Sequence, residues 1–203
     1  MSSRNLELRA SIIVAARELF IANGFEKTSM TDIGKAVSVS KPTVYEHFDS
    51  KEAVMGAVVE SALDELDMNL TKAAARGEMS FEEYINAMPD EFMRLIGSRT
   101  RSAMYRLLIQ EGTRVPSIAR MFASRITTTM YQCYYDLFAR VMDGGECRRM
   151  EYDVARRMFM SPMNTVMLQI AMSGEASVNP ELTRSFFDNY FRMLAQYLLL
   201  KRS

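Results

Sequence analysis

Apolar residues recur at intervals of three and four along most of the chain, which is the spacing of one face of an α-helix. The strict alternation of apolar and polar residues that is typical of a half-buried strand is missing. Proline and glycine, which interrupt helices, are sparse, with 5 and 9 copies in 203 residues. The pattern therefore predicts an all-α protein of about nine helices.

In the first third of the chain, the pattern predicts four helices. The second and third of these are short and joined by a tight turn. The first is expected over about residues 6–22, because Asn23-Gly24 accepts the left-handed conformation that ends a helix. The second is expected over about residues 31–37, and the third follows Ser40, whose hydroxyl is a good N-cap. The fourth is expected over about residues 51–75.

The two short helices divide into an inner and an outer face. The residues expected to point inward are Ile33, Val37, Val39, Val44 and Phe48. Those expected on one outer face are Thr28, Ser40, Lys41, Thr43, Tyr45, His47 and Lys51. This is the arrangement of a helix-turn-helix, whose second helix enters the major groove of DNA.

The remaining chain predicts a second, purely helical domain. The boundary is expected at Arg76-Gly77-Glu78. Further helices are expected over about residues 80–96, with a kink or restart at Pro89, and over about 101–112, 117–142, 153–172 and 180–201. The predicted domains are a helix-turn-helix domain over residues 1–51, a connecting helix over about 51–75, and a ligand-binding and dimerisation domain over 78–203.

The last two predicted helices are apolar over more than one face. One carries Met158, Phe159, Met163, Val166, Met167 and Ile170. The other carries a stripe of Leu182, Phe186, Tyr190, Met193, Leu194, Tyr197 and Leu198, with Phe187 and Phe191 outside it. Such helices need more than one neighbour, which a four-helix bundle across a two-fold dimer supplies. A core formed wholly within one chain is the alternative.

Composition is ordinary for a globular protein, with 48% apolar and 25% charged residues. No apolar run approaches the roughly 20 residues of a membrane span, and the N-terminus lacks the apolar core of a signal peptide. Cys133 and Cys147 indicate no disulfide framework, which favours a cytoplasmic protein with reduced thiols.

The charge balance argues against DNA binding through bulk electrostatics. The whole chain has 25 basic and 25 acidic residues, and residues 1–51 contain seven Lys or Arg against six acids. A DNA-binding surface must therefore depend on a few placed cations, hydroxyls and helix N-termini.

The sequence offers little for catalysis, so the chain is not expected to be an enzyme. It lacks the Cys-x-x-Cys, His-Glu-x-x-His and Gly-rich phosphate-binding motifs. His47 is the only histidine, which excludes a histidine metal cluster and leaves little for acid–base work. No metal and no cofactor are expected.

Methionine is unusually common, with 18 copies. It fills irregular gaps in cores, and it also lines adaptable apolar pockets. The pocket we predict is lined by Phe92, Met104, Leu108, Phe122, Met163 and Met167, with Gln110 and Asn164 as polar anchors. For each of these residues an ordinary place in the core is the alternative.

The N-terminal quarter resembles the TetR (tetracycline-repressor-like) family of bacterial transcriptional regulators. The matching residues are Ile12, Ala15-Ala16, Leu19-Phe20, Gly24-Phe25, Thr28-Ser29-Met30, Ile33, Val39-Ser40, Val44-Tyr45, His47-Phe48 and Ser50-Lys51-Glu52. The rest of the chain matches in helical architecture and length only.

The resemblance implies roles for individual residues. Thr28 and Ser29 match positions that open the second helix against a phosphate, and Lys41 and Thr43 match positions that face base edges. Pro42 stands where close approach to the groove is needed. Tyr45, His47 and Lys51 match phosphate-contacting positions, although Tyr45 as a core residue and Lys51 as a solvated lysine are alternatives. With Ser40 from the outer face, these nine residues form the predicted DNA-binding set.

Two residues depart from the family pattern. Ser38 stands in the turn where the family has glycine, so a side chain must tolerate a conformation that glycine prefers. Gly34 replaces the alanine that is usual in the second helix, at a cost of about 0.8–1 kcal/mol.

The resemblance and the apolar last helices together predict a homodimeric repressor. It would bind a palindromic operator and be released by a small, apolar effector that prefers the non-binding geometry. The predicted dimer interface is Met158, Phe159, Val166, Ile170, Phe186, Tyr190, Met193 and Tyr197. The alternative is an effectorless dimeric DNA-binding protein controlled by a protein partner or by thiol redox state.

Overall fold

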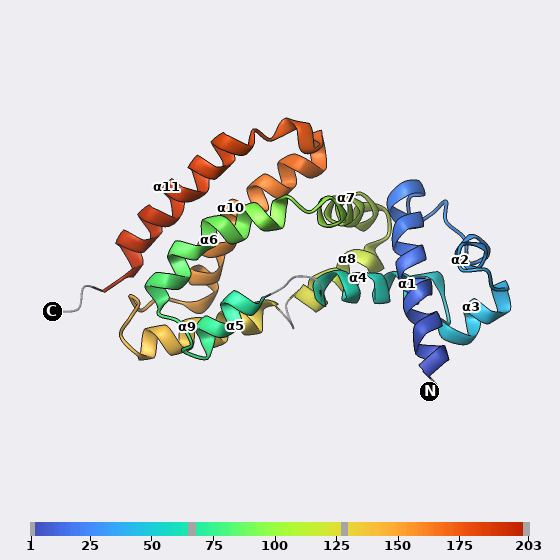
Figure 1. The fold of residues 1–203 in the computed structure, drawn as a ribbon, viewed down its shortest axis with the longest axis horizontal. Helices are drawn as coiled ribbons and strands as arrows, with labels where there is room; N and C mark the ends of the chain where they lie inside the picture. Colours follow the sequence, from blue (N-terminus) through green and yellow to red (C-terminus); the bar gives the residue numbers. More distant parts are fainter. Residues whose placement is uncertain (1–2, 65–67, 127–129, 201–203) are drawn as a thin grey trace. The chain divides into compact units, whose positions relative to one another are not determined.

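The computed structural model describes residues 3–64, 68–126 and 130–200, and these are almost entirely helical (Figure 1). The chain divides into two compact units: residues 1–66 with 103–125 form the first unit, and residues 67–102 with 126–203 form the second unit. The first unit contains α1 (Ser3–Asn23), α2 (Met30–Ala36), α3 (Lys41–His47), α4 (Lys51–Asp64), α7 (Arg99–Arg114) from Ala103 onwards, and α8 (Pro116–Ile126). The second unit contains α5 (Asn69–Ala75), α6 (Phe81–Ile96), α9 (Gln132–Asp143), α10 (Tyr152–Ser173), a 3-10 turn (Glu175–Ser177) and α11 (Pro180–Leu198).

The prediction of an all-α fold is confirmed, and two expected long helices are each divided. The helix expected over about residues 51–75 is instead α4 and α5, because the backbone leaves helical geometry at Met68 (φ −85°, ψ 19°). The helix expected over about residues 117–142 is instead α8 and α9. Ile126 is followed in sequence by three threonines, residues 127–129, which have low helix propensity and lie outside the described residues. The described residues therefore form eleven α-helices.

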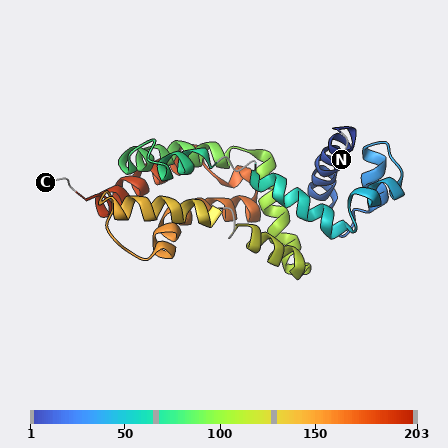
Figure 2. The ribbon, with the colours of Figure 1, turned by 90° about the horizontal axis from the view of Figure 1, so that it is seen from below.

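The first unit is held by α1, which packs against α2 and α4, while α2 packs against α3. Ile12, Ala16 and Phe20 repeat at helical spacing on the buried face of α1. We call α1 to α3 the N-terminal head; Figure 2 shows its three helices from a second direction. On α4, Gly56 lies close to the Met121 side chain of α8, so these two helices also meet within the first unit.

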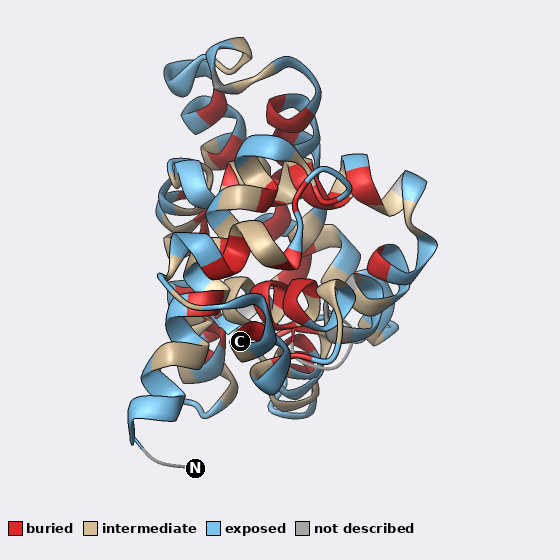
Figure 3. Cartoon of the chain, turned by 90° about the vertical axis from the view of Figure 1, so that its right-hand side faces the viewer, coloured by how far each residue is buried: buried red, intermediate tan, exposed pale blue. Residues whose placement is uncertain are grey.

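The second unit is built around an aromatic core. The rings of Phe81, Tyr84, Phe138, Phe159 and Phe191 lie in mutual contact, with centroid distances of 5.3–6.2 Å. They come from α6, α9, α10 and α11, so one cluster joins four helices. Figure 3 shows the buried positions as red segments of the helices.

The last helix, α11, divides its apolar residues between the core and the surface. Its buried residues are Thr183, Phe187, Phe191, Leu194 and Leu198. The exposed ones include Leu182, Phe186, Met193 and Tyr197. Phe187 and Phe191, which lie outside the predicted stripe, are the aromatic residues of α11 that the core covers. The two apolar stripes differ by one residue along the helix, so periodicity alone did not show which one the core would cover.

Candidate nucleic-acid interface

The second helix of the N-terminal head begins at a reciprocal cap. The Ser29 hydroxyl and backbone N–H donate to the Asp32 carboxylate at 2.6 and 3.0 Å, and the Asp32 N–H donates to the Ser29 oxygen at 3.2 Å. This is a capping box, which satisfies donors that the first helical turn leaves free. The hydroxyl bond, followed by the backbone bond, lowers the pKa of the Asp32 carboxyl.

The turn between α2 and α3 is closed by Ser38 in the left-handed conformation, with φ of 58°. A side chain is therefore present at a conformation that glycine adopts at lower cost, as the sequence indicated. The N–H of Val39 then donates to the carbonyl of Gly34 at 2.9 Å. A methyl group on Gly34 would lie 2.9 Å from the Val39 carbonyl oxygen, so this glycine permits the close approach of the turn.

The third helix presents a polar face around one buried residue. Ser40 caps it by accepting from the Thr43 N–H at 3.3 Å, and a proline follows in the first turn. Val44 is fully buried, whereas Lys41 is exposed and Tyr45 is 44% exposed. The Lys41 ammonium lies 5.7 Å from the centre of the Tyr45 ring, so the two outward side chains are neighbours. The alternative of Tyr45 as a core residue is not what the structure shows.

The end of α3 is fixed to α1 by Arg9, a residue that the sequence analysis did not single out. Its guanidinium donates to the His47 carbonyl at 2.7 Å and lies 4.0 Å from the centre of the Phe48 ring. Arg9 therefore sets the direction of α3 rather than adding a free charge. The contact joins residues 38 positions apart, so no local pattern in the sequence announces it.

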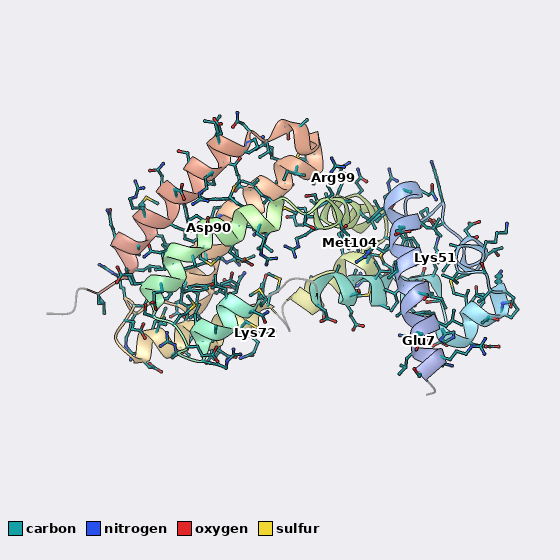
Figure 4. The ribbon with its side chains drawn as sticks, in the orientation of Figure 1. Glu7, Lys51, Lys72, Asp90, Arg99 and Met104 are labelled. Atoms are coloured by element: carbon teal, nitrogen blue, oxygen red, sulfur yellow. The ribbon has the colours of Figure 1, made fainter. Side chains whose placement is uncertain are left out.

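Two members of the predicted set do not lie on the outer face in the expected way. Thr28 is 2% exposed, because its hydroxyl donates to the carbonyls of Gly24 at 2.9 Å and Leu19 at 3.3 Å. The prediction of an outward Thr28 is therefore wrong. The Lys51 ammonium donates to the Phe25 carbonyl at 2.7 Å and lies 4.3 Å from the centre of that ring (Figure 4). Lys51 therefore holds the turn before α2 by a hydrogen bond to its backbone, and the alternative of a freely solvated lysine is not what the structure shows.

The remaining predicted residues form one polar surface on the N-terminal head. Ser29, Ser40, Lys41, Pro42 and Tyr45 are exposed, and Thr43 and His47 are partly exposed. The surface offers hydroxyls, one ammonium and an aromatic hydroxyl, and the N-terminal residues of such a helix are those that contact base edges. These groups suit hydrogen bonding to phosphate and base edges with little net charge.

The predicted dimer residues divide between core and surface. Phe159, Val166 and Ile170 are at most 5% exposed within a single chain, so they belong to the protomer's own core. Phe186, Met193 and Tyr197 are 42–58% exposed. Met158 and Tyr190 are half-buried, and the Tyr190 hydroxyl donates to the Met158 carbonyl at 2.6 Å.

The predicted pocket residues are not gathered in one unit. Phe92, Met163 and Met167 are buried in the second unit. The Phe92 ring packs edge-on against Phe187 and Phe191. Met104 and Leu108 are buried in the first unit, to which Gln110 and Phe122 also belong, while the Phe122 side chain lies outside the description. Gln110 and Asn164, the predicted polar anchors, are both exposed. Neither side chain therefore lies where a buried polar anchor would be needed.

Two family descriptions match the chain over the elements just described. Residues 12–58 match bacterial regulatory proteins of the tetR family, and residues 83–184 match the C-terminal domain of AefR-like transcriptional repressors. The chain belongs to the TetR family. The proteins that the chain matches in this family are transcriptional regulators and not enzymes.

Individual relatives agree with this assignment. The regulator UidR of Escherichia coli K12 is 32% identical over 124 residues, which are 59% of this chain and 59% of UidR. A TetR-family regulator from Mesorhizobium loti superposes with a TM-score of 0.81 at 22% identity, covering 98% of this chain and all of that one. FadR of Bacillus subtilis, solved with stearoyl-CoA, gives a TM-score of 0.70 at 16% identity, covering 91% of this chain and 96% of that one. These structures share the TetR fold with the chain. Within the described residues, no helix has both the length and the apolar character to cross a membrane.

Proposed function

We propose that the chain is a ligand-responsive TetR-type repressor that binds a palindromic operator as a homodimer and is released by a small, apolar effector. The observation that carries the proposal is the outward face of α3. Lys41, Thr43 and Tyr45 surround the buried Val44 there, so the helix exposes polar groups while its apolar side anchors it. Lysine and threonine in such a helix reach base edges, and the hydroxyls around them donate to phosphates.

The proposed DNA contacts are the exposed members of the predicted set. Lys41 and Thr43 face bases, and Pro42 permits close approach to the groove. Ser29, Ser40, Tyr45 and His47 lie toward the phosphate backbone. Thr28 and Lys51 act inside the head through the carbonyls that they bind. The nearly balanced charge of this region makes the geometry of each contact more important than the total charge.

The exposed apolar face of α11 supports a two-fold dimer. Leu182, Phe186, Met193 and Tyr197 are 42–71% exposed and lie on one side of a long helix. Burying such a face against its symmetry mate would remove apolar surface from water, which is the main driving force of association. The two recognition helices would then read half-sites about 34–36 Å apart or a multiple of that distance.

The effector is proposed to enter the methionine-rich part of the helical domain. Met163 and Met167 are buried in the second unit, and methionine side chains can repack around an apolar molecule. FadR of Bacillus subtilis, which shares the fold, was solved with stearoyl-CoA, a ligand with a long apolar chain. Release requires that the effector favour the geometry that does not fit DNA.

Duplex selection tests the DNA-binding proposal. The full chain, incubated with a pool of random duplexes, should enrich an inverted repeat. Lys41→Ala should relax the preference at one position of each half-site, at a cost of about 1–3 kcal/mol in binding. Lys72→Ala, which removes an exposed lysine from α5, is the control and should leave the selected sequence unchanged. Enrichment of no common sequence by the wild-type protein would overturn the proposal.

The dimer is tested at its exposed face. Met193→Lys places a charge at the centre of the proposed interface and should give a monomeric mass in sedimentation. Leu6→Lys changes an equally exposed apolar residue of α1 and should leave a dimer. A dimer that persists in Met193→Lys would assign the interface to another surface.

Control by thiol redox state finds little support in the structure. Burial raises the pKa of the Cys147 thiol to about 11, and burial also raises that of Cys133. The thiolate is the reactive form, so both cysteines are poorly reactive near neutral pH. Control by a protein partner stays as the second candidate, and a thermal shift produced by apolar small molecules would favour the effector instead.

A further inference from the structure

An acidic residue interrupts the buried side of α7. Glu111 and its helical neighbour Leu107 are each 4% exposed, and Ile118 on α8 is 1% exposed. One oxygen, Oε1, accepts a hydrogen bond from the backbone N–H of Phe25 at 3.1 Å. Phe25 lies in the turn between α1 and α2, so a helix from the middle of the chain contacts the N-terminal head within the first unit.

Stability does not explain a carboxylate at this position. The second oxygen, Oε2, is buried and has no hydrogen-bond partner in the part of the chain that the structure describes. Arg106 lines the same crevice, yet its buried Nε is also without a partner there. A buried charged group that is only partly hydrogen-bonded costs free energy, and an apolar side chain would avoid that cost. What the carboxylate provides, and an apolar side chain would not, is the oxygen that accepts from the N–H of Phe25.

The turn that contains Phe25 is held from two sides. Glu111 binds the N–H of Phe25, and the ammonium of Lys51, the first residue of α4, binds its carbonyl at 2.7 Å. Gly24 makes the first contact possible: its φ is 85°, and a methyl group there would lie 3.0 Å from Oε1 of Glu111. The peptide groups on either side of Phe25 are therefore fixed by α7 and by α4.

The position of α2 depends on this turn. The Thr28 hydroxyl donates back to the carbonyl of Gly24 at 2.9 Å, and the next residue, Ser29, caps α2. Since α2 packs against α3, a displaced turn displaces the helix that is proposed to enter the groove. The contacts form a short, continuous route from Glu111 to α3.

We propose that Glu111 is a positioning residue for DNA binding: its carboxylate holds the Phe25 turn so that α2 and α3 keep the geometry that fits the operator. The proposal rests on the proposed DNA-binding function.

Two substitutions at one position separate this role from a structural one. Glu111→Gln keeps an oxygen that accepts from Phe25, and it should bind a selected duplex nearly as tightly as the wild-type protein. Glu111→Met is similar in size but has no such acceptor, and it should weaken binding by about tenfold to a hundredfold. The preferred DNA sequence should stay the same in both, because neither touches the bases.

Amide hydrogen exchange of Phe25 reports the contact without DNA. Protection should persist in Glu111→Gln and be lost in Glu111→Met. Ile118→Val removes one buried methyl from α8 and serves as the control for a general loss of stability in the same unit. It should leave Phe25 protected and DNA binding nearly unchanged.

The outcomes separate the two proposals. Equal DNA binding by Glu111→Met and Glu111→Gln would overturn the positioning role, and so would an equal loss in Ile118→Val. Unchanged Phe25 protection in Glu111→Met would overturn it as well, whatever the DNA result. If the wild-type protein selects no duplex, the DNA-binding function fails, while the exchange experiment still decides whether Glu111 holds the turn.

Discussion

The N-terminal head and the second unit are both helical, but they are stabilised in different ways. The head contains two helices of seven residues each, held by caps, a left-handed turn and long-range contacts to backbone carbonyls. In the second unit, four helices of 12 to 22 residues supply the rings of an aromatic core. Helices as short as α2 and α3 are not stable alone, so each needs specific partners to fix its direction.

The two regions therefore meet different requirements: the head fixes the direction of polar groups, and the second unit packs apolar side chains. A DNA-binding surface must hold a few polar groups in fixed directions, and hydrogen bonds supply direction. The second unit is held by apolar volume, which packed aromatic rings and buried methionines supply. Substitutions in the second unit should therefore act through lost packing, and those in the head through backbone geometry.

The largest effect is expected at Phe159. It is fully buried, and its ring contacts those of Phe81, Tyr84, Phe138 and Phe191. Phe159→Ala should reduce the free energy of unfolding by about 3–5 kcal/mol, because the cavity cannot close between rings that are held by three other helices. Denaturant unfolding at a fixed protein concentration measures the change.

An exposed aromatic residue of the same unit is the control for this substitution. Tyr135 is 50% exposed and contacts one ring, that of Tyr152, at 4.6 Å. Tyr135→Ala should cost about 1 kcal/mol. Equal losses at the two positions would show that the aromatic cluster is not the main source of stability in the second unit.

Gly34 should produce the next largest effect, with a sign opposite to that expected from helix propensity. Alanine is favoured over glycine in helices by about 1 kcal/mol. A methyl group here, however, would meet the Val39 backbone carbonyl at 2.9 Å, so Gly34→Ala should destabilise the head by about 1–3 kcal/mol. The cost that the sequence assigned to this glycine is thus outweighed by the close turn. Thermal unfolding of the full chain is the measurement.

Gly56 is the matched control for Gly34. A methyl group there would also lie 2.9 Å from another atom, but that atom is the sulfur of the flexible Met121 side chain. Gly56→Ala should therefore be neutral or stabilising. If both substitutions have the same effect, the rigidity of the turn is not the reason.

Ser38 should give a smaller effect in the stabilising direction. Its φ of 58° costs an L-residue about 1–2 kcal/mol, most of which glycine avoids. Ser38→Gly should therefore raise the melting temperature of the head. Ser38→Ala retains the β-carbon and should not, so a gain with alanine would point to the hydroxyl instead of the backbone.

The smallest effect concerns pH and the cap of α2. Hydrogen bonds from Ser29 place the pKa of the Asp32 carboxyl below its value in the unfolded chain. The stabilisation is therefore complete above the unfolded pKa of about 3.9, and it is lost as the pH falls through the lower pKa of the folded state. Asp32→Asn should be less stable than the wild-type protein at pH 7, and the difference should vanish in acid. A difference that grows on acidification would contradict the assignment.

Much of the N-terminal head could be predicted from local sequence. Caps, the turn and the burial of Val44 follow from residues within four positions of one another, and the structure confirms them. The contacts made by Arg9, Lys51 and Glu111 join residues 26 to 86 positions apart, so local patterns cannot show them. Glu111 gave one signal, an acid within a buried apolar stripe.

The helical class, the helix-turn-helix and the family could all be predicted from the sequence, because they depend on periodicity, caps and a short arrangement of residue types that resembles the family. The tertiary structure decided which of two apolar stripes of α11 faces the core and which side chains of the head face inward. It also decided that residues 103–125 belong with the head. The reason is physical: an amphipathic pattern states that a face must be covered, whereas only the packed neighbours determine what covers it.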